Sequence, residues 1–565
     1  MRVYWKLYIL MCKLEEKIDR LREIIKEKSF VTKDQHKIFS KSGEESAWLF
    51  DIKKIILDPE ALNLITGIFW EKFGNEYPFQ TGGQEVTALP LLGAIIQKGN
   101  EIGKPVSSFF IRKSRKKDGL QKIVEGEVGN SKIILIDDII NSGQTIDRQI
   151  KILEKERKKI DFVFTLVNFR ESTDYNFLKE RRIKLVSLYP VTDFGLDFVT
   201  KKTDIPQNYF NVIWHFQSQN PDYFHVVPKS TPALDDDKIY FGSDSGIFWA
   251  LDQKNGKIAW KYEVMWFKQK GIFSSPALHG DNVYFGAYDG NVYCLDKNTG
   301  ERKWMFMEAD WVGSSPAVAE NLNLLFIGLE FGLIKKQGGI AALDLDSGKK
   351  KWEFRMMEFV HASPAYCCER EYVAIGANDG KMRMFRAKDG KLIWEYQTGG
   401  DVKYRPTYDV GNGVIAFGSM DGNLYVCDIE SGELIALFKT EAGIYSTPLF
   451  WEDKIIFTSL DKSVYCWDYK KNKILWIFHA SGRIFASPVL IEGSVFVGSN
   501  DGRMYELDPD TGKLKSFFQF LERITNEIVC NSDAKKFFVL THANELFCLA
   551  RQYSTAEFFG KKLHK

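Results

Sequence analysis

The stretch SPVLIEGSVFVGSNDGRMYELD, residues 487–508, contains the repeating unit that decides the fold of most of this chain. A small residue and a proline open the unit, an alternating strand follows, and an Asp-Gly turn leads into another strand that ends in Leu-Asp. The opening pair recurs at intervals of 40 to 48 residues, a period typical of β-propeller blades. It is found at Thr231-Pro232, Ser275-Pro276, Ser315-Pro316, Ser363-Pro364, Thr447-Pro448 and Ser487-Pro488, with Arg405-Pro406 as a variant.

Each unit closes with a further strand that frequently contains a tryptophan, so four short strands make one blade. An eighth unit, over residues 526–550, supplies only three strands. The segment 211–216, Asn-Val-Ile-Trp-His-Phe, precedes the first blade and reads like one of the tryptophan-bearing strands. Because completing the last blade with this segment removes two exposed sheet edges, we predict an all-β, eight-bladed propeller over residues 206–551, followed by a basic tail at 552–565.

These repeats resemble the PQQ-like repeat family, which includes quinoprotein dehydrogenases and a scaffold lipoprotein of outer-membrane assembly. The resemblance concerns the fold, because the proline, Asp-Gly and tryptophan positions are structural parts of a blade. Quinoprotein dehydrogenases have adjacent cysteines against their quinone, together with a calcium site. Here the pair Cys367-Cys368 falls in a strand without a surrounding cluster of calcium ligands, so no PQQ is expected. We interpret the propeller as a surface for a protein partner.

The N-terminal third contains the strongest chemical motif, IILIDDIINSGQT at residues 133–145. A run of β-branched residues predicts a buried parallel strand that ends in two acids and is followed by a glycine turn and a helix. Backbone N–H groups and the helix dipole converge at such a helix start, so the segment predicts an anion site. The two carboxylates suit the hydroxyls of a ribose whose 5′-phosphate lies in the loop. An ordinary βα unit with an acidic turn is the alternative.

The motif resembles the PRPP-binding signature of type I phosphoribosyltransferases, and further segments in the matching order resemble the orotate-type branch. These segments are residues 39–51, 81–90, 111–119 and 167–171. The resemblance implies a multidomain protein whose residues 1–205 form an α/β domain with a parallel sheet and helices. The N-terminal segment at 1–30 is expected to be helical with one buried apolar stripe, because apolar residues recur at helical spacing between charges, at Leu14, Ile18, Leu21, Ile24 and Ile25. It also implies a transferase acting on PRPP and a nitrogenous base or nucleotide, with Mg²⁺ carried by PRPP and no metal held directly by the protein. A homodimer through this domain is implied as well.

The resemblance also assigns a role to each matching residue. The catalytic set, which would act on the departing pyrophosphate, contains Arg112, Lys113, Lys116 and Asp118. The PRPP-binding set contains Lys41, Gly83, Glu85, Asp137, Asp138, Asn141, Ser142, Gly143, Gln144 and Thr145. The base-binding set contains Phe50, which would stack on the base, and Arg170, which would pair with its carboxylate.

Two departures from the family pattern bear on activity. Asp118 stands where the family has histidine, so a carboxylate lies near the departing pyrophosphate in place of a donor. Asn141 replaces the Thr or Asp that opens the phosphate loop, a milder change because Asn still forms hydrogen bonds. The alternative to an enzyme is therefore a PRPP or nucleotide sensor with little turnover, in a regulatory or defence role, whose propeller is an interaction scaffold.

Charge and composition exclude several other classes. The net charge of +2 gives no nucleic-acid footprint, and the basic loop at 112–117 has few interleaved aromatic residues, so no nucleic acid is expected. The apolar run at 3–11 is far shorter than the ~20 residues that span a bilayer, so neither a membrane nor a secretory route is expected. The eight cysteines, most of them in apolar strand patterns, indicate reduced thiols in a cytoplasmic protein.

Overall fold

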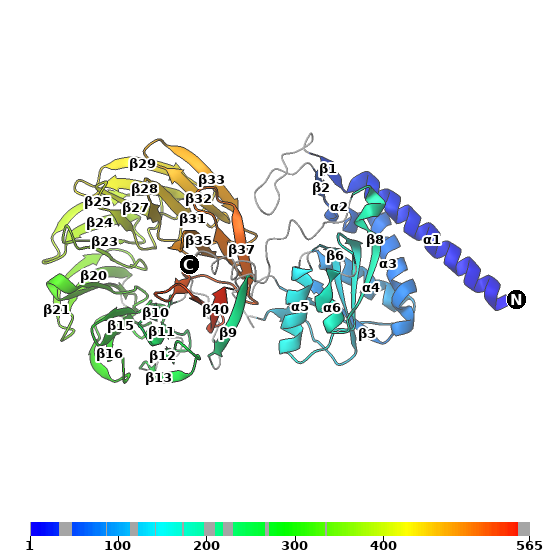
Figure 1. The fold of residues 1–565 in the computed structure, drawn as a ribbon, viewed down its shortest axis with the longest axis horizontal. Coiled ribbons are helices and arrows are strands. Elements are labelled where there is room, and N and C mark those ends of the chain that lie inside the picture. Colours follow the sequence, from blue (N-terminus) through cyan, green and yellow to red (C-terminus); the bar gives the residue numbers. More distant parts are fainter. Residues whose placement is uncertain are drawn as a thin grey trace, which may run out of the picture. The chain divides into compact units, whose positions relative to one another are not determined.

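A computed structural model describes residues 2–32, 48–85, 87–112, 122–141, 143–171, 174–196, 209–218, 230–265, 271–333 and 336–551. The chain divides into two compact units, Met1–Asp204 and Ile205–Lys565 (Figure 1). The predicted fold class is confirmed, because the first unit is an α/β domain and the second is an eight-bladed β-propeller.

The first unit is built on a six-stranded sheet in the order β5-β4-β3-β6-β7-β8. The strands are β3 (Phe79–Gln84), β4 (Ser108–Ile111), β5 (Val124–Glu125), β6 (Lys132–Ile140), β7 (Phe162–Asn168) and β8 (Lys184–Pro190). All neighbouring pairs are parallel except β4 and β5. Because the carboxyl ends of β3, β6 and β7 lie at one edge, the loops that follow these strands are brought together there.

Six α-helices are described in this unit: α1 (Arg2–Lys28), α2 (Lys53–Ile56), α3 (Pro59–Phe73), α4 (Ala88–Glu101), α5 (Gln144–Lys155) and α6 (Asn176–Glu180). A short antiparallel pair, β1 (Phe30–Thr32) and β2 (Trp48–Phe50), lies outside the main sheet. The apolar stripe expected on the N-terminal helix is confirmed, since Leu21, Ile24 and Ile25 are fully buried in the core shared with α3, α4 and the sheet. Within the described residues, no helix is long and apolar enough to cross a membrane.

The second unit contains eight four-stranded antiparallel sheets, one for each blade (Figure 1). The first two blades are β10 (Ala233–Leu234), β11 (Lys238–Gly242), β12 (Ile247–Asp252), β13 (Ile258–Glu263), and β14 (Ala277–His279), β15 (Asn282–Gly286), β16 (Val292–Asp296), β17 (Arg302–Phe306). The third and fourth are β18 (Ala317–Ala319), β19 (Leu324–Phe331), β20 (Gln337–Asp344), β21 (Lys350–Met356), and β22 (Ala365–Cys367), β23 (Tyr372–Gly376), β24 (Lys381–Arg386), β25 (Leu392–Gln397). The fifth and sixth are β26 (Thr407–Asp409), β27 (Val414–Gly418), β28 (Asn423–Asp428), β29 (Leu434–Lys439), and β30 (Leu449–Trp451), β31 (Lys454–Thr458), β32 (Ser463–Asp468), β33 (Lys473–His479). The last two are β34 (Val489–Ile491), β35 (Ser494–Gly498), β36 (Arg503–Leu507), β37 (Leu514–Gln519), and β38 (Val529–Cys530), β39 (Lys536–Leu540), β40 (Glu545–Arg551), β9 (Phe210–Gln217).

The ring closes as the sequence predicted. Strand β9 pairs antiparallel with β40 and completes the eighth blade, with Trp214 opposite Cys548. The Trp214 indole donates a hydrogen bond of 3.1 Å to the carbonyl oxygen of Gln253, which belongs to the first blade. Trp260 of the first blade makes the same bond, 2.9 Å long, to Lys297 of the second. Strand β9 therefore also links the last blade to the first by the contact that joins other consecutive blades.

The described cysteines are free thiols. Cys294, Cys427, Cys466 and Cys548 lie buried in strands, and burial raises the pKa of each of these thiols to about 12. In the adjacent pair, Cys367 is buried at the end of β22 and Cys368 is exposed. The interpretation of Cys367 as a buried strand thiol is confirmed, whereas the same expectation for Cys368 is wrong, because this residue lies in the turn that follows β22.

Candidate functional site

Strand β6 positions the two acids of the motif. Ile133 to Ile136 are almost completely buried, as the apolar and mostly β-branched run predicted. The strand does not end at the acids, however, but continues through both of them to Ile140. Both acids therefore lie within the strand, where Asp137 is 8% exposed and Asp138 is partly buried.

Both carboxylates accept hydrogen bonds from the backbone that follows them. Asp137 Oδ1 accepts from the N–H of Asp138 at 3.0 Å, and Asp138 Oδ1 accepts from the N–H of Ile139 at 2.9 Å. Burial raises the pKa of Asp138, and hydrogen bonding to Asp137 acts in the opposite direction. The free site thus holds a carboxyl group whose ionised form is disfavoured by burial.

Gly143 makes the turn between β6 and α5. It lies at the N-terminal end of the helix with φ of 79°, in the left-handed region, and its carbonyl accepts from the N–H of Asp147 at 2.8 Å. A Cβ atom at this position would lie 2.6 and 2.7 Å from two ring carbons of Phe177. Only glycine fits both the backbone and the space, and the turn leaves the N–H groups at the start of α5 unbonded within the helix, as an anion site requires.

The loops after β6 and β7 meet beside this turn. Nε of Arg170 donates to Oδ1 of Asn141 at 3.4 Å, and the Arg170 side chain is only 6% exposed. Nδ2 of Asn168 donates to the Arg170 carbonyl at 2.8 Å, and the Tyr175 hydroxyl donates to the Ile140 carbonyl at 3.0 Å. The structure therefore brings the residue expected to bind the base against the residue that opens the expected phosphate loop.

The end of β3 contributes a second group. Gly83 lies inside the buried strand, where a Cβ would come within 2.4 Å of Ala88 and 2.6 Å of the Ile136 carbonyl oxygen, so close packing requires glycine there. The backbone N–H of Glu85 donates to Ile111 at 3.0 Å. Its carboxylate pairs with Arg112 at 3.6 Å, and Arg112 also lies 3.7 Å from a carboxylate oxygen of Glu125. The guanidinium expected to meet pyrophosphate is thus held by two carboxylates.

Several residues of the predicted site are not described by the structure or are described only in part. Lys41, Lys113, Lys116, Asp118 and Ser142 are outside the described residues. Phe50 and Gln144 are placed only by their backbone, in β2 and at the first position of α5. Thr145 follows in the first turn of α5 and is exposed. The roles expected of all these residues stay predictions.

Three further residues shape the site and were not singled out by the sequence. Tyr175 and Phe177 cover Gly143 from the segment at the start of α6, and Arg148 of α5 donates to the Arg112 carbonyl at 3.4 Å. Arg148 is 7% exposed. No motif marks these positions, because their role depends on contact between segments that are 35 and 36 residues apart.

The acidic side chains at this sheet edge bear on metal binding. In the part of the chain that the structure describes, no three His, Cys, Asp or Glu side chains form a ready metal site. Carboxylate oxygens are ligands that Mg²⁺ accepts, and Asp137 and Asp138 place such oxygens at the strand end before the phosphate loop. The donor chemistry at this edge fits a magnesium ion that arrives with a phosphorylated substrate.

Comparisons with known proteins separate the two units. Residues 210–320 match a family model described as outer membrane protein assembly factor BamB, and residues 333–559 match one described as the beta-propeller of beta-alanine-activating enzyme. Among solved structures, BamB from Moraxella catarrhalis superposes with a TM-score of 0.50 at 19% identity, covering 61% of this chain and 98% of that one. A europium-containing methanol dehydrogenase superposes with a TM-score of 0.51 at 14% identity, covering 60% of this chain and 93% of that one. At these identities the likeness concerns the propeller fold alone.

The curated proteins most similar in sequence include several orotate phosphoribosyltransferases. Orotate phosphoribosyltransferase of Bradyrhizobium sp. is 29% identical over 163 residues, 28% of this chain and 86% of the relative. That of Rhodopseudomonas palustris is 28% identical over 180 residues, 31% and 94% of the two chains. Orotate phosphoribosyltransferase of Pyrococcus abyssi is 34% identical over 156 residues, which are 27% of this chain and 82% of that relative. Through its N-terminal unit, the chain belongs to the orotate phosphoribosyltransferase family.

Proposed function

We propose that the N-terminal unit is a PRPP-dependent, Mg²⁺-requiring phosphoribosyltransferase of the orotate type, and that the propeller binds a protein partner. One observation supports the enzymatic proposal above the others. The glycine turn at Gly143 opens α5 beside the two acids of β6, and Arg170 lies against Asn141 at the same sheet edge. A phosphate, a ribose and a carboxylate-bearing base would each find groups of suitable chemistry there.

The proposed reaction is a displacement at the anomeric carbon of PRPP. The bond from this carbon to pyrophosphate breaks with its electron pair going to pyrophosphate, and a bond to a ring nitrogen of the base forms. The N-terminal end of α5 would hold the 5′-phosphate, and Asp137 and Asp138 would accept from the ribose hydroxyls. Mg²⁺, bound to the diphosphate, would supply positive charge to the leaving group.

Cationic side chains would complete the stabilisation of the leaving group. In the free protein, Arg112 pairs with Glu85 and Glu125. These pairs are longer than a charge-assisted hydrogen bond, so pyrophosphate can compete for the guanidinium at small cost. Lys113 and Lys116 would add charge from the same loop, and Lys41 would assist.

The second candidate is a sensor that binds PRPP or a nucleotide with little turnover, and Asp118 favours it. A carboxylate at this position repels the leaving pyrophosphate, whereas the family histidine donates to it. A homodimer through the N-terminal unit and a cytoplasmic location belong to both candidates as proposals.

The test uses the full chain. Calorimetric titration with Mg²⁺ and PRPP is followed by measurement of pyrophosphate release with orotate and a panel of other bases. The variant Asp137→Asn with Asp138→Asn should abolish PRPP binding, because both charged acceptors for the ribose are lost. The control Glu101→Gln with Glu156→Gln, which removes two exposed carboxylates, should bind as the unaltered protein does. Absence of heat with millimolar PRPP and Mg²⁺ would overturn both candidates, whereas binding without pyrophosphate release would favour the sensor.

A further inference from the structure

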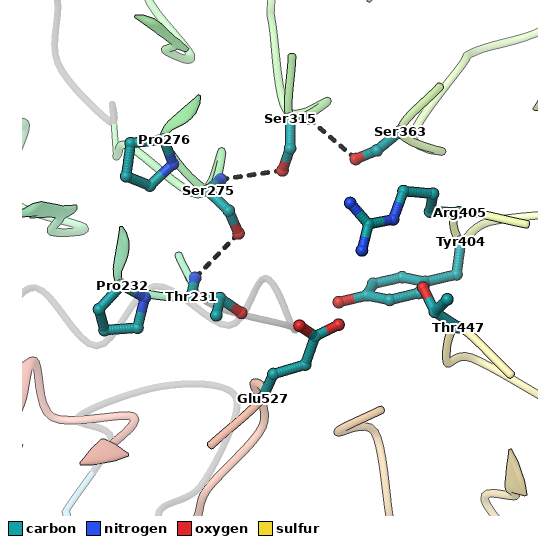
Figure 2. A pocket seen from close by; sticks show the side chains of 10 residues that line it. All are labelled: Thr231, Pro232, Ser275, Pro276, Ser315, Ser363, Tyr404, Arg405, Thr447 and Glu527. Atoms are coloured by element: carbon teal, nitrogen blue, oxygen red, sulfur yellow. Dashed lines mark hydrogen bonds between the residues drawn. The ribbon is translucent and has the colours of Figure 1, made fainter. Parts of the chain in front are cut away.

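In seven blades one residue directly precedes the blade proline, and Glu527, which precedes Ile528, takes the corresponding place in the eighth. The eight residues at this position, which we call the hydroxyl ring, are Thr231, Ser275, Ser315, Ser363, Arg405, Thr447, Ser487 and Glu527. All but Ser487 line one cavity of about 180 Å³ in the propeller unit (Figure 2). Six of the eight carry a hydroxyl, whereas the fifth blade presents an arginine and the eighth a glutamate.

Four hydroxyls of this ring, those of the serines, have a structural task. The backbone N–H of Thr231 donates to Oγ of Ser275 at 2.9 Å, and that of Ser275 donates to Oγ of Ser315 at 2.9 Å. The same bond runs from Ser315 to Ser363 at 2.9 Å and from Thr447 to Ser487 at 3.0 Å. Each bond joins one blade to the next, and Figure 2 shows those that link Thr231, Ser275, Ser315 and Ser363.

Arg405 and Glu527 do not serve this task. A guanidinium has no acceptor for the backbone N–H of the preceding blade, and no such bond to Glu527 is found among the described residues. Neither Arg405 nor Glu527 forms an ion pair with any described residue. Both side chains instead point into the cavity (Figure 2). The hydrogen bonds between blades therefore give no role to the charged groups of Arg405 and Glu527.

The position just before the ring also changes in the fifth blade. The other blades have Ser230, Ser274, Ser314, Ala362, Ser446, Ala486 and Asn526 there. The fifth blade has Tyr404, whose side chain lines the cavity with its hydroxyl directed into it (Figure 2). Burial is the main cause that raises the pKa of Tyr404, the negative charge of Glu527 adds to it, and Arg405 lowers it. The phenol thus lies within electrostatic reach of both charged groups.

One hydroxyl of the cavity wall has no partner. Oγ1 of Thr447 is buried and makes no hydrogen bond with any described residue. Buried polar atoms without partners are uncommon and point to water or a ligand that satisfies them. The cavity thus offers a cation, an anion, a phenol and an unbonded hydroxyl to a molecule inside it.

Size and charge define the class of that molecule. At the ~30 Å³ that a water occupies in the liquid, the cavity has room for roughly six waters, which suits a small metabolite. A ligand with only a negative charge would be attracted by Arg405 and repelled by Glu527. A ligand with only a positive charge would be attracted by Glu527 and repelled by Arg405. We propose that this cavity binds a small zwitterion, an amino acid with one carboxylate that pairs with Arg405 and one ammonium that pairs with Glu527.

The charges of this cavity favour a zwitterion over PQQ. PQQ is a larger, multiply anionic molecule, which Glu527 would repel, and Cys367 and Cys368 are not among the residues that line the space. The zwitterion proposal is also independent of phosphoribosyl transfer, because every residue it uses belongs to the second unit.

The test is calorimetric titration of the full chain. The ligands are the proteinogenic α-amino acids and the ω-amino acids from glycine to aminohexanoate, each beside the carboxylic acid and the amine of matching length. We expect a subset of the amino acids to bind about 10-fold or more tightly than the matched acid or amine, because each of these lacks one charge-assisted pair. Chain length should select among the ω-amino acids, because the ligand must span from Arg405 to Glu527.

Variants at the two charges give the second arm. Arg405→Ser and Glu527→Ser install the residue that the ring already uses, so both should fold, and each should weaken binding by about 10- to 100-fold. The controls Lys388→Ser and Glu433→Ser remove exposed charges in turns outside the cavity lining and should leave affinity unchanged. The proposal is overturned if no amino acid binds, if the matched acid or amine binds equally well, or if both ring variants retain full affinity.

Discussion

Replacement of Gly143 by alanine tests the argument that the phosphate loop depends on one residue. With φ of 79°, the position lies in the left-handed region, where a non-glycine residue costs about 1–2 kcal/mol. The new Cβ would also lie 2.6 and 2.7 Å from the ring of Phe177, so the ring or the turn must move, and overpacking of this kind costs about 1–3 kcal/mol. Together these terms predict that Gly143→Ala lowers the free energy of unfolding of the first unit by about 2–5 kcal/mol.

The chain offers a matched control. Gly195 has φ of 76°, and a Cβ there would have no neighbour within 4 Å. Gly195→Ala should therefore cost only the backbone term of about 1–2 kcal/mol. Urea unfolding of residues 1–204 measures both variants, and PRPP titration of the full chain should show weaker binding for Gly143→Ala alone.

A double-mutant cycle isolates the steric part. In a Phe177→Ala background, Gly143→Ala should cost no more than Gly195→Ala does, because the ring that it would contact is gone. If Gly143→Ala and Gly195→Ala prove equally destabilising and PRPP affinity is unchanged, then neither the contact with Phe177 nor the role of the turn in phosphate binding is correct.

Three further predictions follow from the two units. If the first unit is a working transferase, Lys116→Ala should reduce pyrophosphate release by ~10²–10³ and Asp118→His should raise it; robust turnover that Lys116→Ala leaves untouched would place this loop away from the active site. Deletion of residues 206–217, which removes Trp214 and the strand that closes the ring, should cause aggregation or loss of cooperative unfolding, and a monodisperse variant with unchanged melting would contradict the closure. Burial raises the pKa of Asp138 in the folded state, so this carboxyl group stabilises the fold most below its ordinary pKa of 3.8, and the stabilisation declines as pH rises through the raised pKa. At neutral pH, Asp138→Asn should therefore unfold at a higher urea concentration than the unaltered unit while binding PRPP more weakly. Equal urea midpoints would refute the burial argument.

Local patterns were sufficient for most of the fold. The Pro and Asp-Gly spacing, together with a further unit of three strands at 526–550, predicted eight blades. The resemblance of the segment around Trp214 to the fourth strands predicted the closing partner, which the pairing of β9 with β40 confirms. The run from Ile133 predicted a buried strand followed by a glycine turn and a helix, as β6 and α5 show. Such features are encoded by the side-chain period and turn chemistry of each segment, so they can be inferred without knowledge of distant contacts.

The site itself depended on contacts that no local pattern contains. Sequence spacing placed the end of the strand at the acids, but pairing with β7 extends β6 to Ile140. The cover of Phe177 over Gly143 arises only when the sheet brings separate loops to one edge.

The propeller shows the same division between sequence and tertiary structure. The sequence by itself determined that Arg405 and Glu527 replace the usual hydroxyl residue in two of the repeats. Only ring closure decided that both of them line one cavity. The physical reason is that a repeat specifies its own strands through short-range preferences, whereas the distance between residues of different blades is set by how all eight sheets pack around the ring.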